Sequence, residues 1–461
     1  MKFYIDQHGC AKNQVDGEEL VARLEAEGYE YVPNGADADL VIVNTCGFIE
    51  SAKKESIEAI AQIKSTWPDK KVLVAGCLAQ RYPKVLLDEM QEADGIFGNN
   101  DLSQIGEAVR NTMAGKRMAL TPSAPQTTQT VYFERERLFD FPGTAHVKIT
   151  EGCSNHCSYC AIPLIRGELR SRTLDDVVSE CKSLLDRGIF ELNLVGQDLS
   201  GYGKDLNGGA SLLPELLARL SVLNYDFRVR VLYIHPDHFP EAILPIMAKD
   251  PRILPYFDLP FQHASPRLLH TMHRFGSEDR YLELIEHIRS TLPDAMIRST
   301  FLIGFPGETD EDFAILQDFQ QKARLDWLGS FTYSREEDTP AYSMPGRVPK
   351  KVALARQKQI EEAQGPITTQ RLQRFVGQEL EILVEEQVEG SSMSLGRAWM
   401  QAPDVDGLTV MEEPLAPGTV VTAKIESVNG VDLFARRVGE VRKTPSGCVT
   451  STGFGTAMAA K

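Results

Sequence analysis

Three cysteines stand close together near the middle of the chain. Cys153, Cys157 and Cys160 lie in EGCSNHCSYC with the spacing C-x3-C-x2-C, directly after an expected strand at Ala145–Thr150. Three thiolates in so short a loop can bind three irons of a [4Fe–4S] cluster, which leaves the fourth iron open to a small ligand. The alternative is a zinc site, for which His156 is an awkward fourth ligand because it lies inside the loop. The pattern favours the cluster.

A second set of cysteines is spread along the sequence and recurs with the strands. Cys10, Cys46 and Cys77 follow the apolar runs in KFYIDQHGC, DLVIVNTC and KVLVAGC. One βαβ step takes about 30 residues, and parallel strands end at one edge of their sheet. The three thiols can therefore converge on a second cluster, although buried structural cysteines are the alternative. A glycine beside each cysteine favours convergence, because the backbone must pass close to a bulky ligand. These glycines are Gly9, Gly47 and Gly76.

The elements that position these cysteines indicate an α/β protein of several domains, as expected for 461 residues. Strand and helix patterns alternate over residues 1–118, which predicts a doubly wound parallel domain. A polar, proline-bearing linker is expected at 119–138, and a partial (β/α) barrel at 139–374. Short alternating runs predict a small β-barrel at 375–440, followed by a flexible tail at 441–461.

The barrel prediction rests on six strand patterns separated by helical ones. The chemistry of such a barrel lies at the carboxyl ends of its strands, which is where the cysteine loop follows the first strand. The expected strands are Ala145–Thr150, Glu191–Val195, Arg228–Ile234, Tyr256–Leu259, Met296–Ile303 and Trp327–Tyr333.

Composition and charge narrow the functional classes. Apolar residues make up 42% of the chain and charged residues 25%, which is typical of a folded soluble protein. The net charge of −16 does not favour a nucleic-acid partner. Residues 376–440 hold 12 acidic and four basic residues, a net charge of −8. Such a surface is poorly suited to phosphate and fits a basic protein partner.

The chain has no apolar run of membrane-spanning length and no visible signal peptide. We therefore expect a cytoplasmic protein with no membrane partner. In that reducing compartment cysteines serve more often as ligands than in disulfides.

The cysteine loop, with Tyr159 before its third cysteine, resembles the radical S-adenosylmethionine (SAM) superfamily. That resemblance implies that SAM chelates the open iron, and that one electron cleaves it to a 5′-deoxyadenosyl radical that abstracts hydrogen from carbon. The whole chain further resembles the methylthiotransferase branch of the superfamily, whose C-terminal β domain is a TRAM module. The segments that carry this resemblance are GCAKNQVDGE (9–18), VIVNTCGFIESAK (41–53), VAGCLAQRYP (74–83), KITEGCSNHCSYCAIPLIRGELRSR (148–172), PFQHASPRLLHTMHR (260–274) and IGFPGETDEDF (303–313).

This resemblance implies two [4Fe–4S] clusters and SAM as cofactors. Cys10, Cys46 and Cys77 would bind the auxiliary cluster, which the family uses in sulfur delivery. The other three cysteines would bind the radical SAM cluster. An electron donor is a required partner.

Two methylthiotransferase subfamilies are similar to the chain. One modifies an adenosine beside the tRNA anticodon, and the other adds a methylthio group to the β-carbon of an aspartate in small-subunit ribosomal protein S-twelve. GCAKN, PFQHAS and FTYSREEDTPAY (331–342) resemble the second, as does the acidic β domain, so tRNA is not the expected partner. The resemblance therefore implies S-twelve as the substrate, free or within the assembled subunit. A non-catalytic metal-cluster protein that docks on the ribosome is the alternative from another class.

Further candidate residues lie at the expected mouth of the barrel. Gly196, Gln197 and Asp198 follow the second barrel strand and, as in similar enzymes, can approach SAM or form a plain turn. Arg298 can pair with the SAM carboxylate or form a structural ion pair. Three histidines also follow strands three and four, and we expect structural roles for them rather than substrate binding. They are His235, His238 and His263.

Overall fold

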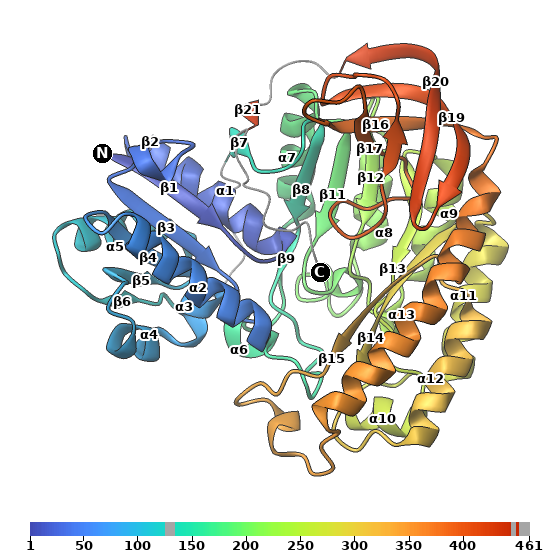
Figure 1. The fold of residues 1–461 in the computed structure, drawn as a ribbon, viewed down its shortest axis with the longest axis horizontal. Helices are drawn as coiled ribbons and strands as arrows, with labels where there is room; N and C mark the ends of the chain where they lie inside the picture. Colours follow the sequence, from blue (N-terminus) through green and yellow to red (C-terminus); the bar gives the residue numbers. More distant parts are fainter. Residues whose placement is uncertain (125–133, 444–448, 451–461) are drawn as a thin grey trace.

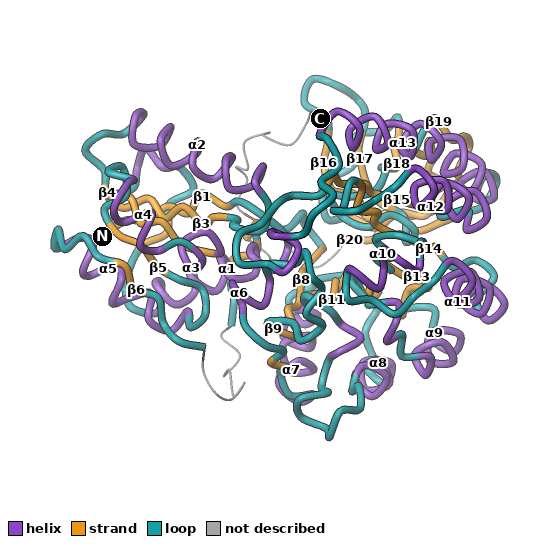
Figure 2. The backbone as a smooth tube through the Cα atoms, turned by 90° about the horizontal axis from the view of Figure 1, so that it is seen from below, coloured by secondary structure: helices purple, strands orange, loops and turns teal. Residues whose placement is uncertain are grey.

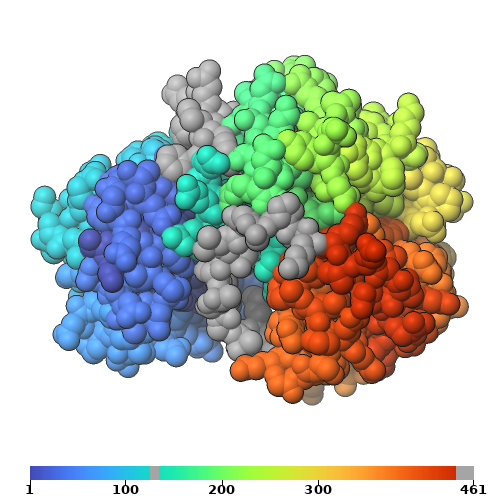
Figure 3. All heavy atoms as spheres, turned by 90° about the horizontal axis from the view of Figure 1, so that it is seen from above, coloured from blue at the N-terminus to red at the C-terminus, as the bar shows by residue number. Residues whose placement is uncertain are grey.

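The computed structural model describes residues 1–124, 134–443 and 449–450. The expected linker and the expected tail therefore lie partly outside the described residues. The chain forms two parallel sheets with their helices and one small closed barrel (Figure 1). In the space-filling view the N-terminal and C-terminal units occupy separate parts of the surface (Figure 3). Across the described ranges, no helix is both long and apolar enough to cross a membrane.

The N-terminal unit is a six-stranded parallel sheet with the order β2-β1-β3-β4-β5-β6. Its strands are β1 (Lys2–Gln7), β2 (Glu30–Tyr31), β3 (Leu40–Thr45), β4 (Lys71–Gly76), β5 (Gly95–Phe97) and β6 (Ala119–Leu120). Its helices are α1 (Ala11–Ala26), α2 (Glu50–Thr66), α3 (Cys77–Arg81), α4 (Pro83–Glu89) and α5 (Ile105–Met113). The predicted doubly wound fold is confirmed.

Both faces of this sheet are buried, which explains the continuous apolar runs of its strands. On β3, Ile42 packs with Leu20 of α1 in one apolar cluster. The next residue, Val43, points to the other face and packs with Ile60 of α2. This alternation holds β3 between two helical layers, and its carboxyl end is left at the sheet edge.

The central unit is an open, parallel, six-stranded sheet with the order β15-β14-β13-β12-β11-β8. Its strands are β8 (Thr144–Lys148), β11 (Glu191–Val195), β12 (Arg228–Val231), β13 (Ile253–Asp258), β14 (Met296–Ile303) and β15 (Trp327–Thr332). Its helices are α6 (Ile162–Arg166), α7 (Leu174–Asp186), α8 (Leu213–Ser221), α9 (Leu244–Lys249), α10 (Pro266–Thr271), α11 (Glu278–Thr291), α12 (Asp310–Ala323) and α13 (Lys350–Leu372). Because β8 and β15 remain edge strands, the barrel is partial, as predicted.

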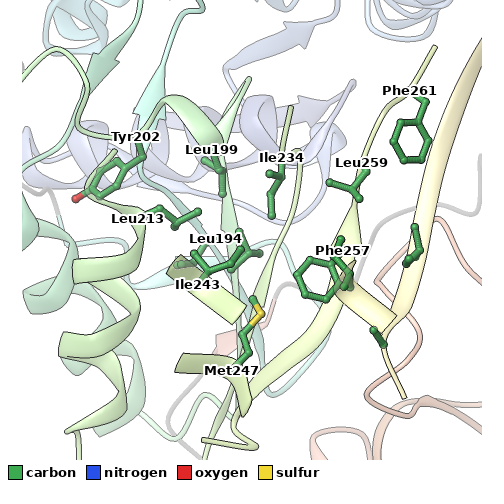
Figure 4. Packing of buried hydrophobic residues seen from close by; sticks show 14 of the residues in the cluster. Leu194, Leu199, Tyr202, Leu213, Ile234, Ile243, Met247, Phe257, Leu259 and Phe261 are labelled. Atoms are coloured by element: carbon green, nitrogen blue, oxygen red, sulfur yellow. The ribbon is translucent and has the colours of Figure 1, made fainter. Parts of the chain in front are cut away.

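The two faces of the central sheet have different partners. Leu194 and Phe257 belong to the large cluster under the surrounding helices, together with Met247 of α9 (Figure 4). Their neighbours Val195 and Tyr256 point to the inner face and pack instead with residues of the C-terminal unit. The helices therefore lie outside the curved sheet, as the backbone view also shows (Figure 2).

The C-terminal unit is a closed five-stranded barrel that docks on this inner face. Its strands are β16 (Glu379–Gln387), β17 (Ser394–Arg397), β18 (Thr409–Met411), β19 (Thr419–Asn429) and β20 (Asp432–Lys443). The indole N–H of Trp327 on β15 donates to the Met400 carbonyl at 2.9 Å. Two small pairings complete the fold: β7 (Arg137–Leu138) with β21 (Val449–Thr450), and β9 (Thr150–Glu151) with β10 (Arg170–Ser171).

Candidate functional site

Three thiols lie at the carboxyl ends of three neighbouring strands of the N-terminal sheet. Cys10 directly precedes α1 after β1, Cys46 follows β3, and Cys77 begins α3 immediately after β4. The loops are in contact, since a methyl group added at Gly9 would come within 3.2 Å of the Cys46 Cβ. One added at Gly47 would come within 2.8 Å of the Cys77 carbonyl group. The structure thus brings this set together, and the glycines allow loop-to-loop contact.

The electrostatics of these thiols show how close they are. Burial, followed by the thiolates of Cys77 and Cys10, raises the pKa of Cys46 to about 12. Burial also raises the pKa of Cys77, although the nearby Arg166 guanidinium opposes this. At Cys10, burial opposes ionisation, but the charges of Lys12 and Arg166 and backbone hydrogen bonds together lower the pKa. Three thiols crowded in this way favour a shared cationic centre that relieves their repulsion.

Cys77 is the most buried of the three and has two nitrogen donors. The amide of Asn99 donates to its Sγ at 3.3 Å, and the guanidinium of Arg166 donates at 3.2 Å. Arg166 also binds Asp16 of α1 at 2.7 Å and Glu151 of β9 at 2.8 Å. The sequence does not single out Arg166, because its partners are distant in sequence.

Asn13, of the GCAKN segment, ties the thiol-bearing loops together. Its amide nitrogen donates to the carbonyl of His8 at 2.8 Å and to that of Thr45 at 3.3 Å. The amide of Asn44 donates in return to the Asn13 carbonyl at 2.8 Å. The loops after β1 and β3 are therefore fixed relative to each other by one buried side chain.

The second thiol set occupies the loop between β9 and α6. The backbone N–H of Cys153 donates to the carbonyl of Gly167 at 3.1 Å, and that of Cys160 donates to the Cys157 carbonyl at 3.0 Å. The N–H of Ile162 points at the Cys160 Sγ at 3.5 Å. Cys157 and Cys160 therefore lie in one turn, and the backbone of Cys153 is tied to the residue that follows α6.

This loop is buried enough to shift the pKa values of its thiols. Burial is the main cause that raises the pKa of Cys153 to about 12. Burial and the Cys157 thiolate also raise the pKa of Cys160. Tyr159 between them packs edge-on against Phe305, with ring centroids 6.5 Å apart. As in the first set, closely placed thiols repel one another, and the aromatic ring shields one side of the loop.

The segment that follows the cysteine loop contacts the first thiol set across the boundary between the first two units. Ala161 and Ile165, which follow Cys160, form a buried cluster with Cys77. Arg166, at the end of the same short helix, donates to the Cys77 Sγ. Helix α6 therefore lies between the two thiol sets, and Figure 1 shows it beside the N-terminal unit.

The donor chemistry of both sets fits iron–sulfur clusters. Among the described residues, no three His, Cys, Asp or Glu side chains surround a point where one metal ion could sit. A four-iron cube differs from such a site, because each thiolate binds a different corner. All-sulfur donors suit iron–sulfur clusters, and the helix N-termini beside Cys10 and Cys77 favour a negatively charged group.

Two of the residues predicted to contact SAM lie in the turn after β11. A methyl group at Gly196 would meet the Thr150 hydroxyl at 2.1 Å and Leu199 at 2.7 Å, so packing alone requires a glycine there. The Gln197 amide donates to Glu151 at 3.2 Å. Their contact with SAM remains a prediction.

Asp198, the third of these residues, links the turn after β11 to the cysteine loop. One of its oxygens accepts from the Asn155 amide at 2.8 Å. The other accepts from the Ser200 backbone N–H at 2.9 Å and from the His235 N–H at 3.2 Å. The carboxylate is thus held rigidly beside the second thiol set.

Arg298 lies near the start of β14, away from the carboxyl ends of the strands. Its guanidinium pairs with Asp258 at 3.3 Å and with Asp406 of the C-terminal unit at 3.4 Å. The structural ion pair that sequence reasoning allowed is present, and a SAM contact of Arg298 stays a prediction.

Two of the candidate histidines are held neutral by their surroundings. Burial lowers the pKa of His263 to about 3, and its Nδ1 accepts from the N–H groups of Ala264 and Ser265. Burial, with the Arg274 charge, also lowers the pKa of His235 well below its usual value. At neutral pH neither ring carries a charge that attracts a carboxylate.

Three stretches of the chain match known families. Residues 2–98 match the uncharacterized protein family UPF0004, residues 147–319 the radical SAM superfamily, and residues 376–438 the TRAM domain. Together with the C-x3-C-x2-C loop after the first barrel strand, these matches define a radical SAM enzyme with a C-terminal TRAM domain.

Curated relatives identify the family within that class. The chain is 46% identical to the ribosomal protein uS12 methylthiotransferase RimO of Treponema denticola, over 94% of this chain and 99% of the relative. It is 41% identical to the RimO of Pelotomaculum thermopropionicum, over 95% and 99%. The chain belongs to the RimO family of ribosomal protein uS12 methylthiotransferases.

Solved structures share the fold at low sequence identity. The radical SAM methyltransferase TsrM of Kitasatospora setae, with cobalamin and a [4Fe–4S] cluster bound, superposes with a TM-score of 0.56 at 17% identity, covering 74% of this chain and 76% of TsrM. The cobalamin-dependent SAM radical enzyme OxsB gives 0.51 at 10% identity, over 78% of this chain and 56% of OxsB. These likenesses support the arrangement of the sheets.

Proposed function

We propose that this chain replaces a β C–H bond of an aspartate in small-subunit ribosomal protein S-twelve by a methylthio group. Support comes from its membership of the RimO family and from the two thiol sets on facing elements. The observation that carries the proposal is the contact of α6 with Cys77, because it brings the first set beside the radical SAM loop. Sulfur insertion at a carbon that has lost hydrogen requires this proximity.

We assign a [4Fe–4S] cluster to each set: Cys10, Cys46 and Cys77 for the auxiliary cluster, and the loop cysteines for the radical SAM cluster. When bound, the clusters supply one-electron cleavage of SAM and a site for sulfur. The protein's own task is to orient and shield these groups. Arg166 offsets the negative charge near Cys77, and Asp198 steadies the cysteine loop through Asn155.

The C-terminal barrel supports a protein substrate over a nucleic acid. Of its charged residues, Arg397 and Glu385 turn inward and pair with each other. Most of the other acidic side chains are left on its outer surface. An acidic surface attracts a basic ribosomal protein and repels phosphate. Such a substrate also favours a cytoplasmic location, and the reaction needs an external electron donor.

The decisive experiment is mass spectrometry after anaerobic incubation of the reconstituted enzyme with SAM, a reductant and sulfide. Unmodified small ribosomal subunits, free S-twelve and bulk tRNA are offered separately. We expect a methylthio mass gain on one aspartate of S-twelve, which is lost in Cys153→Ala and in Cys77→Ala. A gain on a tRNA adenosine instead would contradict the assignment. Intact clusters that fail to cleave SAM would favour a non-catalytic ribosome-docking protein.

A further inference from the structure

One cation of the N-terminal unit reaches the barrel without a carboxylate partner. Lys12 lies in the first turn of α1, two residues after Cys10. Its Nζ sits 3.5 Å from the ring centroid of Tyr233, which follows β12 at the carboxyl end of the barrel sheet. The preceding residue, Ala11, packs against the same apolar cluster as Tyr233. The start of α1 therefore contacts the mouth of the barrel.

The charges near Lys12 are otherwise balanced. Lys148 pairs with Asp16 and Glu151, and Arg166 pairs with the same two carboxylates. Among the ion pairs formed by described residues, none includes Lys12, whose contact is with an aromatic face. An ammonium group in this half-buried position is best stabilised by an anion.

The two carboxylates at the barrel mouth, Asp198 and Asp258, form hydrogen bonds and ion pairs with groups other than Lys12. Asp198 accepts from Asn155 and Ser200, as described above. Asp258 pairs with Arg298 at 3.3 Å and accepts from the Tyr233 N–H at 3.2 Å. Within the described residues, the one anionic group beside Lys12 is the Cys10 thiolate, whose charge iron would take up when a cluster is bound. A carboxylate of a bound molecule would then complete the surroundings of the Lys12 ammonium group.

Lys12 also lies between the two thiol sets. Cys10 is two residues away on one side. On the other side, His235 lies two residues after Tyr233, and its backbone N–H donates to Asp198, which holds the cysteine loop through Asn155. A substrate carbon that loses hydrogen at one set and gains sulfur at the other must lie in this region.

We propose that Lys12 binds the side-chain carboxylate of the substrate aspartate and thereby places its β-carbon between the two thiol sets. This inference rests on the proposed function. The β-carbon is bonded directly to the carboxylate carbon, so fixing the carboxylate fixes the reacting atom. Lys12 also makes the site selective, because a nucleoside base and an asparagine both lack the negative charge.

The test is a double-mutant cycle between enzyme and substrate. Wild type, Lys12→Gln and Lys12→Arg are assayed with S-twelve carrying the native aspartate or asparagine at that position. We expect wild type to prefer aspartate by about tenfold or more in kcat/KM, as for a hydrogen bond to a charged group. This preference collapses in Lys12→Gln and is partly restored in Lys12→Arg.

Two controls separate substrate binding from cluster chemistry. Iron and sulfide content, and SAM cleavage without substrate, are measured in Lys12→Gln and in Lys12→Arg, which keeps the positive charge beside Cys10. Lys54→Gln, which removes the same charge from the exposed face of α2, should keep the full preference for aspartate. Loss of a cluster or of SAM cleavage in Lys12→Gln would assign Lys12 to those groups and overturn the inference.

Failure of the inference is distinguishable from failure of the function. Retained aspartate preference in Lys12→Gln overturns the role of Lys12 and leaves the function intact. A wild-type enzyme that holds both clusters and SAM but modifies neither the aspartate nor the asparagine form of S-twelve contradicts the proposed function itself, and the inference with it.

Discussion

At the scale of single residues, Arg166 connects the chemistry of the two thiol sets. It is buried, lies six residues after Cys160 in sequence, and donates to the Sγ of Cys77 in the other unit. Its two carboxylate partners, Asp16 and Glu151, keep the guanidinium oriented. A fixed positive charge beside a thiolate ligand stabilises the reduced state of a bound cluster, because reduction adds negative charge there.

Replacing Arg166 by methionine tests this charge. In a background with Cys153, Cys157 and Cys160 changed to alanine, the proposed auxiliary cluster would be the only cluster left. We expect Arg166→Met to move its reduction potential to a more negative value, because an electron is then added without the nearby cation. Redox titration followed by electron paramagnetic resonance measures the shift. Arg219→Met on the exposed face of α8 is the control, and equal potentials in both variants would rule out the role.

Residue types at strand ends could be read from the sequence, whereas their long-range partners could not. The recurrence of Cys10, Cys46 and Cys77 once per βαβ step is a local pattern, and the structure does bring them together. The contacts of Arg166 and Lys12 join units that are separate in sequence. They depend on how the domains dock, which no local periodicity encodes.

At the scale of elements, long strands were predictable and short ones were not. The expected Met296–Ile303 coincides with β14, because six of its eight residues are apolar or β-branched and give a clear pattern. β2, β5 and β6 have only two or three residues each, and no periodicity can reveal them. These short strands form because their backbones pair with neighbouring strands of the sheet.

The segment after β15 docks the central unit on the N-terminal one. Glu336 there is 2% exposed and accepts from Lys53 at the start of α2 and from Arg81 at the end of α3, at 2.8 and 2.6 Å. Although burial opposes it, hydrogen bonds from Lys53, Ser334 and Arg81 lower the pKa of Glu336. The ionised carboxylate therefore stabilises the docking.

Glu336→Gln should loosen this docking by about 2 kcal/mol, because two cations lose their buried partner. Amide hydrogen exchange in α2 and α3 should become faster. The contribution of Glu336 is present above the unfolded pKa of 4.5 and is lost as the pH falls through the lowered folded pKa. At acidic pH the amide exchange rates of wild type should therefore approach those of the variant. Exposed Glu337→Gln is the matched control, and equal exchange in both variants would contradict the prediction.

At the scale of the whole molecule, the C-terminal barrel closes the inner face of the central sheet. Arg397 is fully buried and pairs with Glu191 of β11 at 2.7 Å and with Glu385 of its own unit. Arg228 and Arg230 of β12 share Glu191. This network joins the two units through charges rather than only through apolar contact.

Arg397→Met should destabilise the protein by about 3–5 kcal/mol, since it leaves a buried carboxylate unpaired. Adding Glu385→Leu should recover much of that loss, because the unpaired acid is then removed. Urea unfolding of the single and double variants measures both effects, with exposed Arg436→Met as the control. A double variant no more stable than the single one would show that the network stabilises through another partner.

The central claim is that this chain removes hydrogen from an aspartate β-carbon of S-twelve and puts a methylthio group there. The most direct measurement supplies S-twelve with deuterium at that β-carbon and follows both products by mass spectrometry. We predict one deuterium in the 5′-deoxyadenosine and a methylthio group on the same aspartate, which has lost one deuterium. Deuterium-free 5′-deoxyadenosine alongside an unmodified aspartate would contradict the claim.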